Sequence, residues 1–211
     1  MFTNASQETL KILRDTSNFQ WHVIPIFVIV LYIYAVEIEK RNWSLVLAGL
    51  AFWGMDVFNE IWNALVLHFT GRSAVWTTPK GSAFVIFAGL NIEITLMFAI
   101  LGIVCIKMLP ADKATKVLGI PNRWFFAVVN SILCVFIEIL LNLANALVWE
   151  YSWWKLPNVF FIFLIGYLPF MVVSFWVYDM EKMKNKIMTL GVIFGVNLAG
   201  IIIFGLGLRW I

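Results

Sequence analysis

Charged residues are scarce in this sequence. Asp, Glu, Lys and Arg make up 13% of its 211 residues, about half of the roughly 25% that is typical of soluble domains. Hydrophobic residues make up 62%, which predicts that most of the chain is buried in lipid. The net charge of +3 is small and is not gathered into a basic stripe, so we expect no nucleic-acid partner.

Cysteine and targeting signals are also sparse. The two cysteines, Cys105 and Cys134, both fall inside apolar runs, where a thiol usually behaves as a small hydrophobe. They give no disulfide framework and do not indicate a compartment. The first 20 residues are polar and lack the apolar core and cleavage site of a signal peptide. We therefore expect the first apolar run to act as its own insertion signal.

Six apolar runs are each long enough to cross a bilayer. A helix needs about 20 apolar residues for this, and each run is bounded by charges, prolines or turn residues. The sequence therefore predicts an all-α integral membrane protein, a bundle of six transmembrane helices that forms a single domain over residues 20–211. The predicted helices cover about residues 20–37, 44–68, 82–108, 123–149, 156–179 and 186–210.

Residues 1–19 precede the first run and are mostly polar. Within them, Ser6 is placed as a helix N-cap, and Leu10 and Leu13 fall on one helical face. This pattern predicts a short interfacial helix that lies on the membrane. A disordered tail is the alternative.

An even number of spans places both termini on one side of the membrane. The loops on the other side carry nine basic residues, against six on the side of the termini. Cytoplasmic loops are rich in Lys and Arg. We therefore expect a multi-pass protein whose termini lie on the non-cytoplasmic side.

Two stretches of the chain resemble each other. A shift of 78 residues aligns "VFNEIWNAL" with "VFIEILLNL". The same shift aligns Glu60 with Glu138 and, beyond the spans, Trp76 with Trp154. The second and fourth spans run in the same direction, so this pattern favours a parallel repeat of two helices. Chance resemblance between apolar segments is the alternative.

Away from the ends of the predicted spans, four carboxylic acids occur, whereas no Lys or Arg does. An ionised acid at the bilayer centre costs at least about 2.5–3.5 kcal/mol, so acids without a basic partner require an explanation. From a helical rise of about 1.5 Å per residue, we expect all four in one layer near the bilayer centre. The candidate catalytic residues are Glu60, Glu138, Asp56 and Glu93.

Three arrangements would make such acids tolerable. They can stay protonated, because an apolar setting disfavours the charged form; they can share protons with each other or with amides; or they can coordinate a cation. Nearby amide and aromatic residues are candidates for substrate binding, unless the amides only hold the helices together. Arg72 is a candidate for holding an anionic headgroup at the surface. The candidate substrate-binding residues are Asn63, Asn142, Asn145, Trp53, Trp62, Trp149, Tyr167 and Arg72.

Histidine provides the test for a metal. His22 and His68 lie on the same side as the termini, and together with Glu60 and Glu138 they could form a carboxylate–histidine site of the kind found in bundle cores. The sequence has no Glu-x-x-His or His-x-x-x-His spacing. We therefore expect neither a metal nor another cofactor.

The last predicted span carries a small-residue face. Gly191 and Gly195 are four residues apart in "GVIFGVNLAG", a spacing that lets another helix approach closely. This face predicts contact with a neighbouring helix, a second copy of the chain or a partner subunit.

Three functions fit these observations. The first is an integral membrane enzyme that uses intramembrane carboxylic acids for acid–base chemistry on a lipid-soluble substrate, such as an isoprenoid. Its acids and aromatic residues are chemically similar to those of small membrane-bound terpene and carotenoid cyclases, although no motif of those enzymes is present. The alternatives are a carrier or channel for protons or cations and a non-catalytic, lipid-binding subunit of a membrane complex. We expect the enzyme.

Overall fold

The structure, a computed structural model, describes residues 1–211 apart from the side chain of Asn18. The fold is mostly helical, because the apolar runs leave few other ways to satisfy the backbone in lipid. The described chain contains seven α-helices: α1 (Asn4–Ile12), α2 (Val23–Glu39), α3 (Trp43–Thr70), α4 (Ile92–Lys107), α5 (Asn122–Leu143), α6 (Leu168–Asp179) and α7 (Met183–Gly200).

Short elements connect these helices. Strand β1 (Trp76–Thr77) pairs antiparallel with β4 (Val148–Trp149), and Trp76 lies opposite Trp149. Strands β2 (Lys116–Val117) and β3 (Ile120–Pro121) form a small hairpin. The remaining elements are the 3-10 turns η1 (Thr16–Asn18) and η2 (Ser152–Trp154) and the π-helical turns η3 (Ile162–Tyr167) and η4 (Ile201–Gly207).

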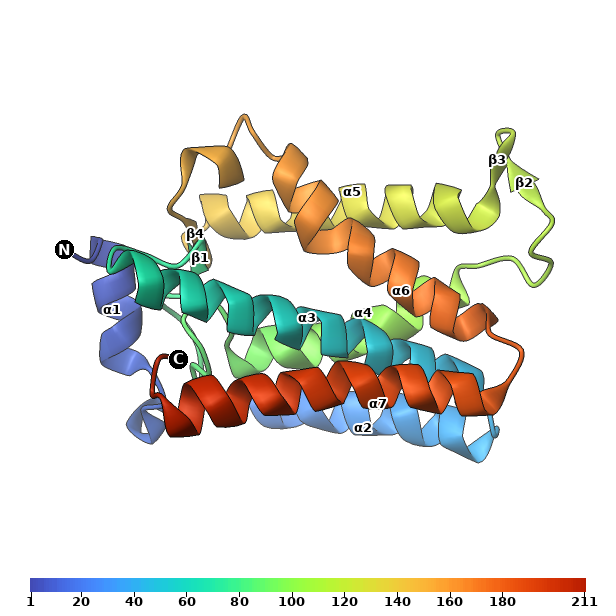
Figure 1. The fold of residues 1–211 in the computed structure, drawn as a ribbon, viewed down its shortest axis with the longest axis horizontal. Coiled ribbons are helices and arrows are strands. Elements are labelled where there is room, and N and C mark those ends of the chain that lie inside the picture. Colours follow the sequence, from blue (N-terminus) through green and yellow to red (C-terminus); the bar gives the residue numbers. More distant parts are fainter.

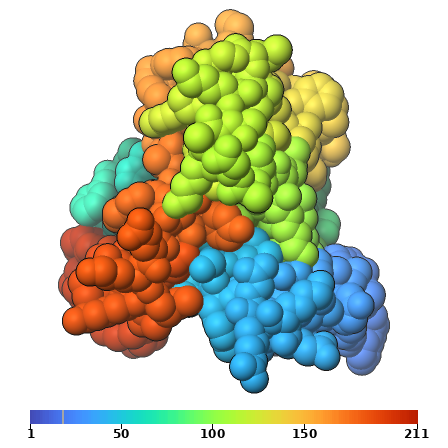
Figure 2. All heavy atoms as spheres, turned by 90° about the vertical axis from the view of Figure 1, so that its right-hand side faces the viewer, coloured from blue at the N-terminus to red at the C-terminus, as the bar shows by residue number. Residues whose placement is uncertain are grey.

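The long helices lie side by side along the longest axis of the molecule, and α6 crosses them obliquely (Figure 1). Both chain ends lie at one end of the bundle, which we call the terminal end; β1 and β4 lie there too. The α2–α3, α4–α5 and α6–α7 connections lie at the other end, which we call the opposite end. Figure 2 shows these three connections grouped together on that face.

Four helices are long and apolar enough to cross a membrane. They are Trp43–Thr70, Asn122–Leu143, Ile162–Asp179 and Met183–Gly207, and no others in the described chain pass this test of length and composition. The other two predicted spans correspond to α2, which has 17 residues, and α4, which has 16 residues. At about 1.5 Å per residue they are about 26 and 24 Å long, slightly less than the ~30 Å hydrocarbon core.

The predicted helix over 82–108 is wrong at its start, because α4 begins only at Ile92. The Asn91 side chain caps it by accepting a hydrogen bond from the Ile94 amide at 2.8 Å. Glu93 accepts from the Ala83 amide at 2.7 Å and from the Ser82 hydroxyl at 2.8 Å, which folds the preceding loop back. The apolar residues of this loop are buried by tertiary packing rather than by a helix.

The predicted helix over 123–149 is wrong at its end, because α5 stops at Leu143. Asn145 has a φ of 56°, a left-handed conformation that Asn adopts more readily than most residues. The Asn142 side chain donates to the Leu147 carbonyl at 3.0 Å and holds the turn that leads into β4. The apolar pattern alone does not reveal this turn.

The N-terminal segment forms a helix, so the alternative of a disordered tail is wrong. Its N-cap is Thr3 rather than Ser6: the Thr3 hydroxyl accepts from the Ser6 amide at 3.4 Å. Ser6 is instead fully buried, and Leu10 packs on a small cluster that includes Leu67 and Ala74. Its position at a membrane surface stays a prediction.

Helix α3 is the centre of the bundle and packs on α4, α6 and α7. Its approach to α4 requires glycine, because a Cβ atom on Gly102 would lie 2.8 Å from the Gly49 carbonyl oxygen and from the Phe52 Cβ. Phe52 also packs on Phe98 and Phe170, with ring centroids 5.9 and 5.7 Å apart. This aromatic layer fills the bundle between the acids described below and the opposite end.

Candidate acid site

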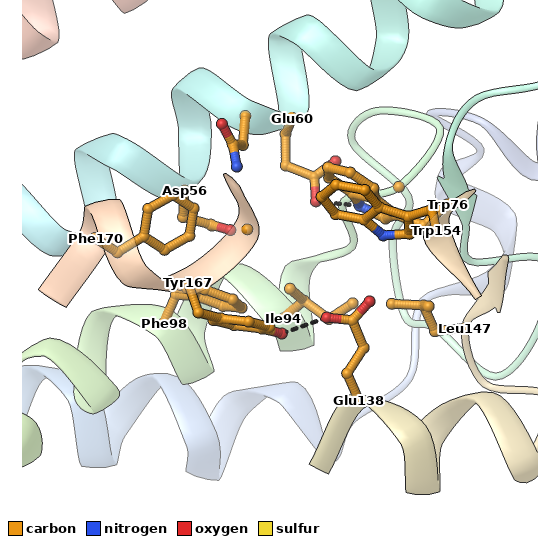
Figure 3. Close-up of a pocket in the computed structure, with 13 residues that line it drawn as sticks. Asp56, Glu60, Trp76, Ile94, Phe98, Glu138, Leu147, Trp154, Tyr167 and Phe170 are labelled. Atoms are coloured by element: carbon orange, nitrogen blue, oxygen red, sulfur yellow. Dashed lines mark hydrogen bonds between the residues drawn. The ribbon is translucent and has the colours of Figure 1, made fainter. Parts of the chain in front are cut away.

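Three of the predicted acids meet around one space inside the bundle, which we call the acid chamber. Asp56 and Glu60 come from α3 and Glu138 from α5, and all three are buried. Figure 3 shows their carboxyl groups around a common volume, which is about 40 Å³. The other walls are mostly aromatic and include Asn59, Trp76, Phe98, Trp154, Tyr167 and Phe170.

Glu138 is held by two hydrogen-bond donors. One carboxyl oxygen accepts from the Trp149 indole at 2.7 Å, and the other accepts from the Tyr167 hydroxyl at 2.6 Å. Donors of this kind stabilise a carboxylate. The sequence analysis named all three residues, and the structure brings them together, although Trp149 reaches Glu138 from a strand rather than from the predicted helix.

Glu60 is held by one donor. Its Oε1 accepts from the Trp76 indole at 2.9 Å. Its Oε2 is buried and forms no hydrogen bond with any described residue. The second oxygen of Glu60 is therefore available to a proton, a water molecule or a ligand in the chamber.

The two glutamates are bound in equivalent ways. Each accepts from a Trp on the strand that follows its own helix, and these two tryptophans, Trp76 and Trp149, are directly paired in β1 and β4. The predicted alignment of Trp76 with Trp154 is therefore wrong beyond the helices. The reason is length: the acid and its Trp are 16 residues apart in the first case and 11 in the second. Trp154 instead stacks on Trp76, with ring centroids 5.2 Å apart.

Asp56 differs from both glutamates. It lies about one helical turn from Glu60 and is 3% exposed, and its carboxyl group forms no hydrogen bond with any described residue. The indole N–H of Trp154 is likewise buried without a hydrogen bond, although it lies near Glu138. Buried polar atoms are paired in most proteins, so Asp56 and the Trp154 indole are groups of the chamber that can still form a hydrogen bond with a bound molecule.

The π-helical turn η3 places Tyr167 at the chamber. Pro169 lies directly after this turn, in the first turn of α6. Proline lacks the N–H that would pair with the Ile165 carbonyl, and the Asn59 side chain donates to that oxygen instead, at 3.4 Å. π-Helical turns are frequent at functional sites.

Two of the predicted substrate-binding amides bond to the backbone of the segments that follow α3 and α5. Asn63 is fully buried and does not line the chamber; its side chain accepts from the Val75 amide at 2.7 Å and donates to the Trp76 carbonyl at 2.8 Å. Asn142 donates to the Leu147 carbonyl, two residues before Trp149. Both amides satisfy the backbone of a non-helical segment and so help to position Trp76 and Trp149.

Four other candidates lie away from the chamber. Asn145 is exposed in the turn after α5. Trp53 donates to the Thr95 hydroxyl at 2.8 Å and lines a separate cavity. Trp62 packs behind the tryptophan pair, with ring centroids 6.0 Å from Trp76. Arg72 is exposed beside Tyr151 at the terminal end. Helical spacing could not show that Asn145, Trp53 and Trp62 point elsewhere, whereas Arg72 lies at the surface, as predicted.

The expectation that all four acids share one layer is wrong for Glu93. It lies in the first turn of α4, where it pairs with His22 at 2.8 Å. His68 stacks on Trp210, with ring centroids 4.7 Å apart. The metal alternative, His22 and His68 with Glu60 and Glu138, is therefore not assembled. Among the described residues, no group of three or more His, Cys, Asp or Glu is placed to hold a metal.

Gly89 is a feature of the chamber that the sequence analysis missed. It lines the acid chamber, and a Cβ atom there would collide with the Asn63 amide and the Trp76 indole nitrogen. The loop can therefore pass the Glu60–Trp76 pair only if this residue has no side chain. Asn59 was not predicted either. Pro169 was the available signal, because it leaves the Ile165 carbonyl without its usual donor, and a polar side chain such as that of Asn59 must replace that donor.

The chamber combines acids with aromatic faces and contains no base stronger than a carboxylate. No Lys, Arg or His lines it among the described residues. Such a site can donate and accept protons, and its aromatic faces can stabilise a positive charge on a bound molecule. Its possible nucleophiles are the carboxylates and the Tyr167 hydroxyl.

Comparison with known proteins agrees with a membrane location. The profile of an uncharacterized membrane protein family matches residues 3–206. The chain belongs to this family. An uncharacterized protein of Archaeoglobus fulgidus is 52% identical over 211 residues, which covers all of both chains. A second, shorter uncharacterized protein of that organism is 45% identical over 56 residues, which is 26% of this chain and all of that protein. No solved structure matches. The chain is thus a membrane protein with several candidate transmembrane helices.

Proposed function

We propose that this protein is an integral membrane enzyme that uses the acids of the chamber for acid–base chemistry on a lipid-soluble substrate, such as an isoprenoid. The observation that carries this proposal is the unequal pairing of the three acids. Glu138 accepts two hydrogen bonds, Glu60 accepts one and Asp56 accepts none. Acids in different surroundings can take opposite roles in one reaction.

Each acid then has a role. Asp56, without a donor, carries the proton and delivers it to an olefin, an epoxide or a leaving oxygen of the substrate. Glu138, with two donors, is ionised, and takes a proton from the substrate or from a bound water. Glu60 lies between these extremes and shares its free oxygen with the ligand. Trp154 and Phe98 face any cationic intermediate with their rings.

The aromatic layer of Phe52, Phe98 and Phe170 makes a carrier or channel a weaker alternative than an enzyme. Transport across the bilayer needs a polar route to both sides, or a movement that opens each side in turn. Between the chamber and the opposite end, the bundle is filled by Phe52, Phe98 and Phe170 and by further buried apolar residues. A substrate that enters and leaves by the same side does not need such a route.

The topology belongs to the same proposal. We propose that α2 and α4 also cross the membrane, which gives six spans and one domain over residues 20–211, with both termini on the non-cytoplasmic side. The grouping of both termini at one end of the bundle supports an even number of spans (Figure 1). The two equivalent Glu–Trp pairs likewise support the proposed repeat.

The test is a conversion of lipid in deuterated water. The full chain is reconstituted in liposomes that contain total lipids extracted from A. fulgidus, and the lipids are compared by mass spectrometry. We expect new species that carry solvent deuterium with the wild-type protein and none with Glu138→Gln. Glu39→Gln, the same change at an exposed position, is the matched control. Unchanged lipids together with a Glu138-dependent proton flux would instead establish a carrier.

A further inference from the structure

A second cavity adjoins the acid chamber on the side of the terminal end, and we call it the outer chamber. Its volume is about 210 Å³, and it lies between the start of α4 and the end of α5. Ile94 and Leu147 line both chambers. Figure 3 shows both side chains next to Glu138. These two apolar side chains are therefore the boundary between the acids and the outer chamber.

The outer chamber exists because α5 stands away from α4. Helix α5 packs on α6 and on η3, whereas its contacts with α4 are few. The α4 side of the gap carries Met97, which is 39% exposed. On the α5 side the gap is lined by Leu141, which is half-buried. In a bilayer these residues face acyl chains, so the gap joins the outer chamber to the lipid.

The two volumes determine what can enter. A water molecule needs about 10–15 Å³ of such space, so a chamber of about 40 Å³ admits a few waters or the end of one aliphatic chain. It does not admit a whole lipid. The next section of a chain-like molecule would have to occupy the outer chamber, and the remainder would lie in the bilayer.

The rim of the outer chamber offers one side chain that can bind a polar head. Lys80 is exposed, and its ammonium group has no hydrogen bond or ion pair in the part of the chain that the structure describes. Glu93, on the same rim, already accepts hydrogen bonds from Ser82, Ala83 and His22. A hydroxyl or anionic head would therefore bind at Lys80.

We propose that the outer chamber is a lateral entrance through which a chain-shaped isoprenoid lipid passes its apolar end to the acids. Ile94 and Leu147 form the gate, and Lys80 holds the polar head outside it. This inference rests on the proposed function, because it assumes that the acids act on the end of a lipid chain.

Photolabelling tests the entrance without any turnover. The probe is geranylgeraniol with a diazirine at its hydrocarbon end, added to the full chain in liposomes, and labelled peptides are mapped by mass spectrometry. We expect label on the segments that carry Asp56, Glu60 and Glu138. Leu147→Trp should reduce this label about tenfold, equivalent to 1.4 kcal/mol of binding free energy. Leu143→Trp, the same change at a neighbouring lipid-facing position, should leave it unchanged.

A second variant covers the case in which Leu147→Trp does not fold. Leu147→Ala widens the gate and should increase the label on the acids. A probe with its diazirine beside the hydroxyl should label residues 80–93 instead, and less so in Lys80→Met. Equal labelling of the acids in wild type, Leu147→Ala and Leu143→Trp would overturn the entrance. Gate-dependent labelling without any lipid conversion would keep the entrance and overturn only the reaction.

Discussion

Charged groups are paired differently at the opposite end of the bundle and in the acid chamber. At the opposite end, buried and half-buried charges have partners from the same chain. Arg123 forms two hydrogen bonds of 2.9 Å with the Asp179 carboxylate. Glu37 is paired with Lys107, and the buried Lys186 donates to the Ser44 hydroxyl at 2.8 Å. Networks of this kind are complete without a ligand.

The acid chamber, nearer the terminal end, is incomplete by the same standard. Three acids meet there without a cation, and the Asp56 carboxyl group has no donor among the described residues. A buried group without a partner lowers stability, so it persists more readily where it serves a function. Charged groups at the opposite end therefore hold the fold, whereas Asp56 and Glu60 keep carboxyl oxygens without a partner among the described residues. Substitutions at both places test this difference.

The largest effect is expected for Glu138→Gln. Loss of the carboxylate removes the base, so turnover should fall by about 10²–10⁴-fold, the usual contribution of general acid–base catalysis. Lipid conversion per folded molecule measures this, with Glu39→Gln as control. Full activity of the Gln variant would show that this acid is structural, like those of the opposite end.

Asp56→Asn should lose activity to a similar degree, about 10²-fold or more, while its folding stability stays the same or rises. No hydrogen bond of Asp56 is lost, because none is formed among the described residues, and an ionisable group leaves an apolar site. Thermal unfolding in detergent measures stability. A marked drop in unfolding temperature would contradict the assignment of Asp56 as an unpartnered acid.

Asn63→Ala should reduce stability more than Asn142→Ala. The first change leaves the Val75 amide and the Trp76 carbonyl buried without partners, at about 1–3 kcal/mol for each such group. The second frees only the Leu147 carbonyl, at about 1 kcal/mol. Chemical denaturation of both variants measures the difference, and equal losses would contradict the positioning role of Asn63.

Tyr167→Phe should reduce turnover about tenfold, because one hydrogen bond to a charged group contributes about 1.5–3 kcal/mol and part of this remains through Trp149. The pH dependence of turnover should shift as well, since Glu138 loses a donor that stabilises its ionised form. A change confined to stability would indicate a packing role only.

The smallest effect on turnover is expected at the opposite end. Asp179→Asn weakens the ion pair between Asp179, whose side chain is 20% exposed, and Arg123, whose side chain is 17% exposed. This should cost about 1 kcal/mol of stability. Turnover per folded molecule should not change. Loss of activity equal to that of Glu138→Gln would remove the distinction between the two ends.

Much of the bundle could be predicted from the sequence. Apolar runs of fixed minimum length locate helices, and acids without basic neighbours stand out in them, so Asp56, Glu60 and Glu138 were found. The same logic failed for Glu93, because the Asn91 cap lies inside an apolar run and hides the start of α4. A pattern of hydrophobicity reports burial, and residues 84–90 are largely buried without being helical.

The partners of the acids could not be predicted. Trp76 and Trp149 reach Glu60 and Glu138 only because the segments after α3 and α5 fold back and pair as β1 and β4. The 78-residue shift that aligns the two helices makes Trp154 the counterpart of Trp76. It misses the true counterpart, Trp149, because α3 is longer than α5. Segment lengths and turns set these contacts, and hydrophobic periodicity does not encode them.

The amino-acid sequence alone shows that the chain enters a membrane and places acids without cations near the middle of its helices, because the cost of a charge in lipid makes that pattern informative. Which acids share a chamber, and which donors hold them, depends on how the helices and loops pack. The physical reason is that non-helical backbone inside the bundle must find its hydrogen bonds within the protein. Asn63 and Asn142 supply those bonds, and so fix where the tryptophans meet the glutamates.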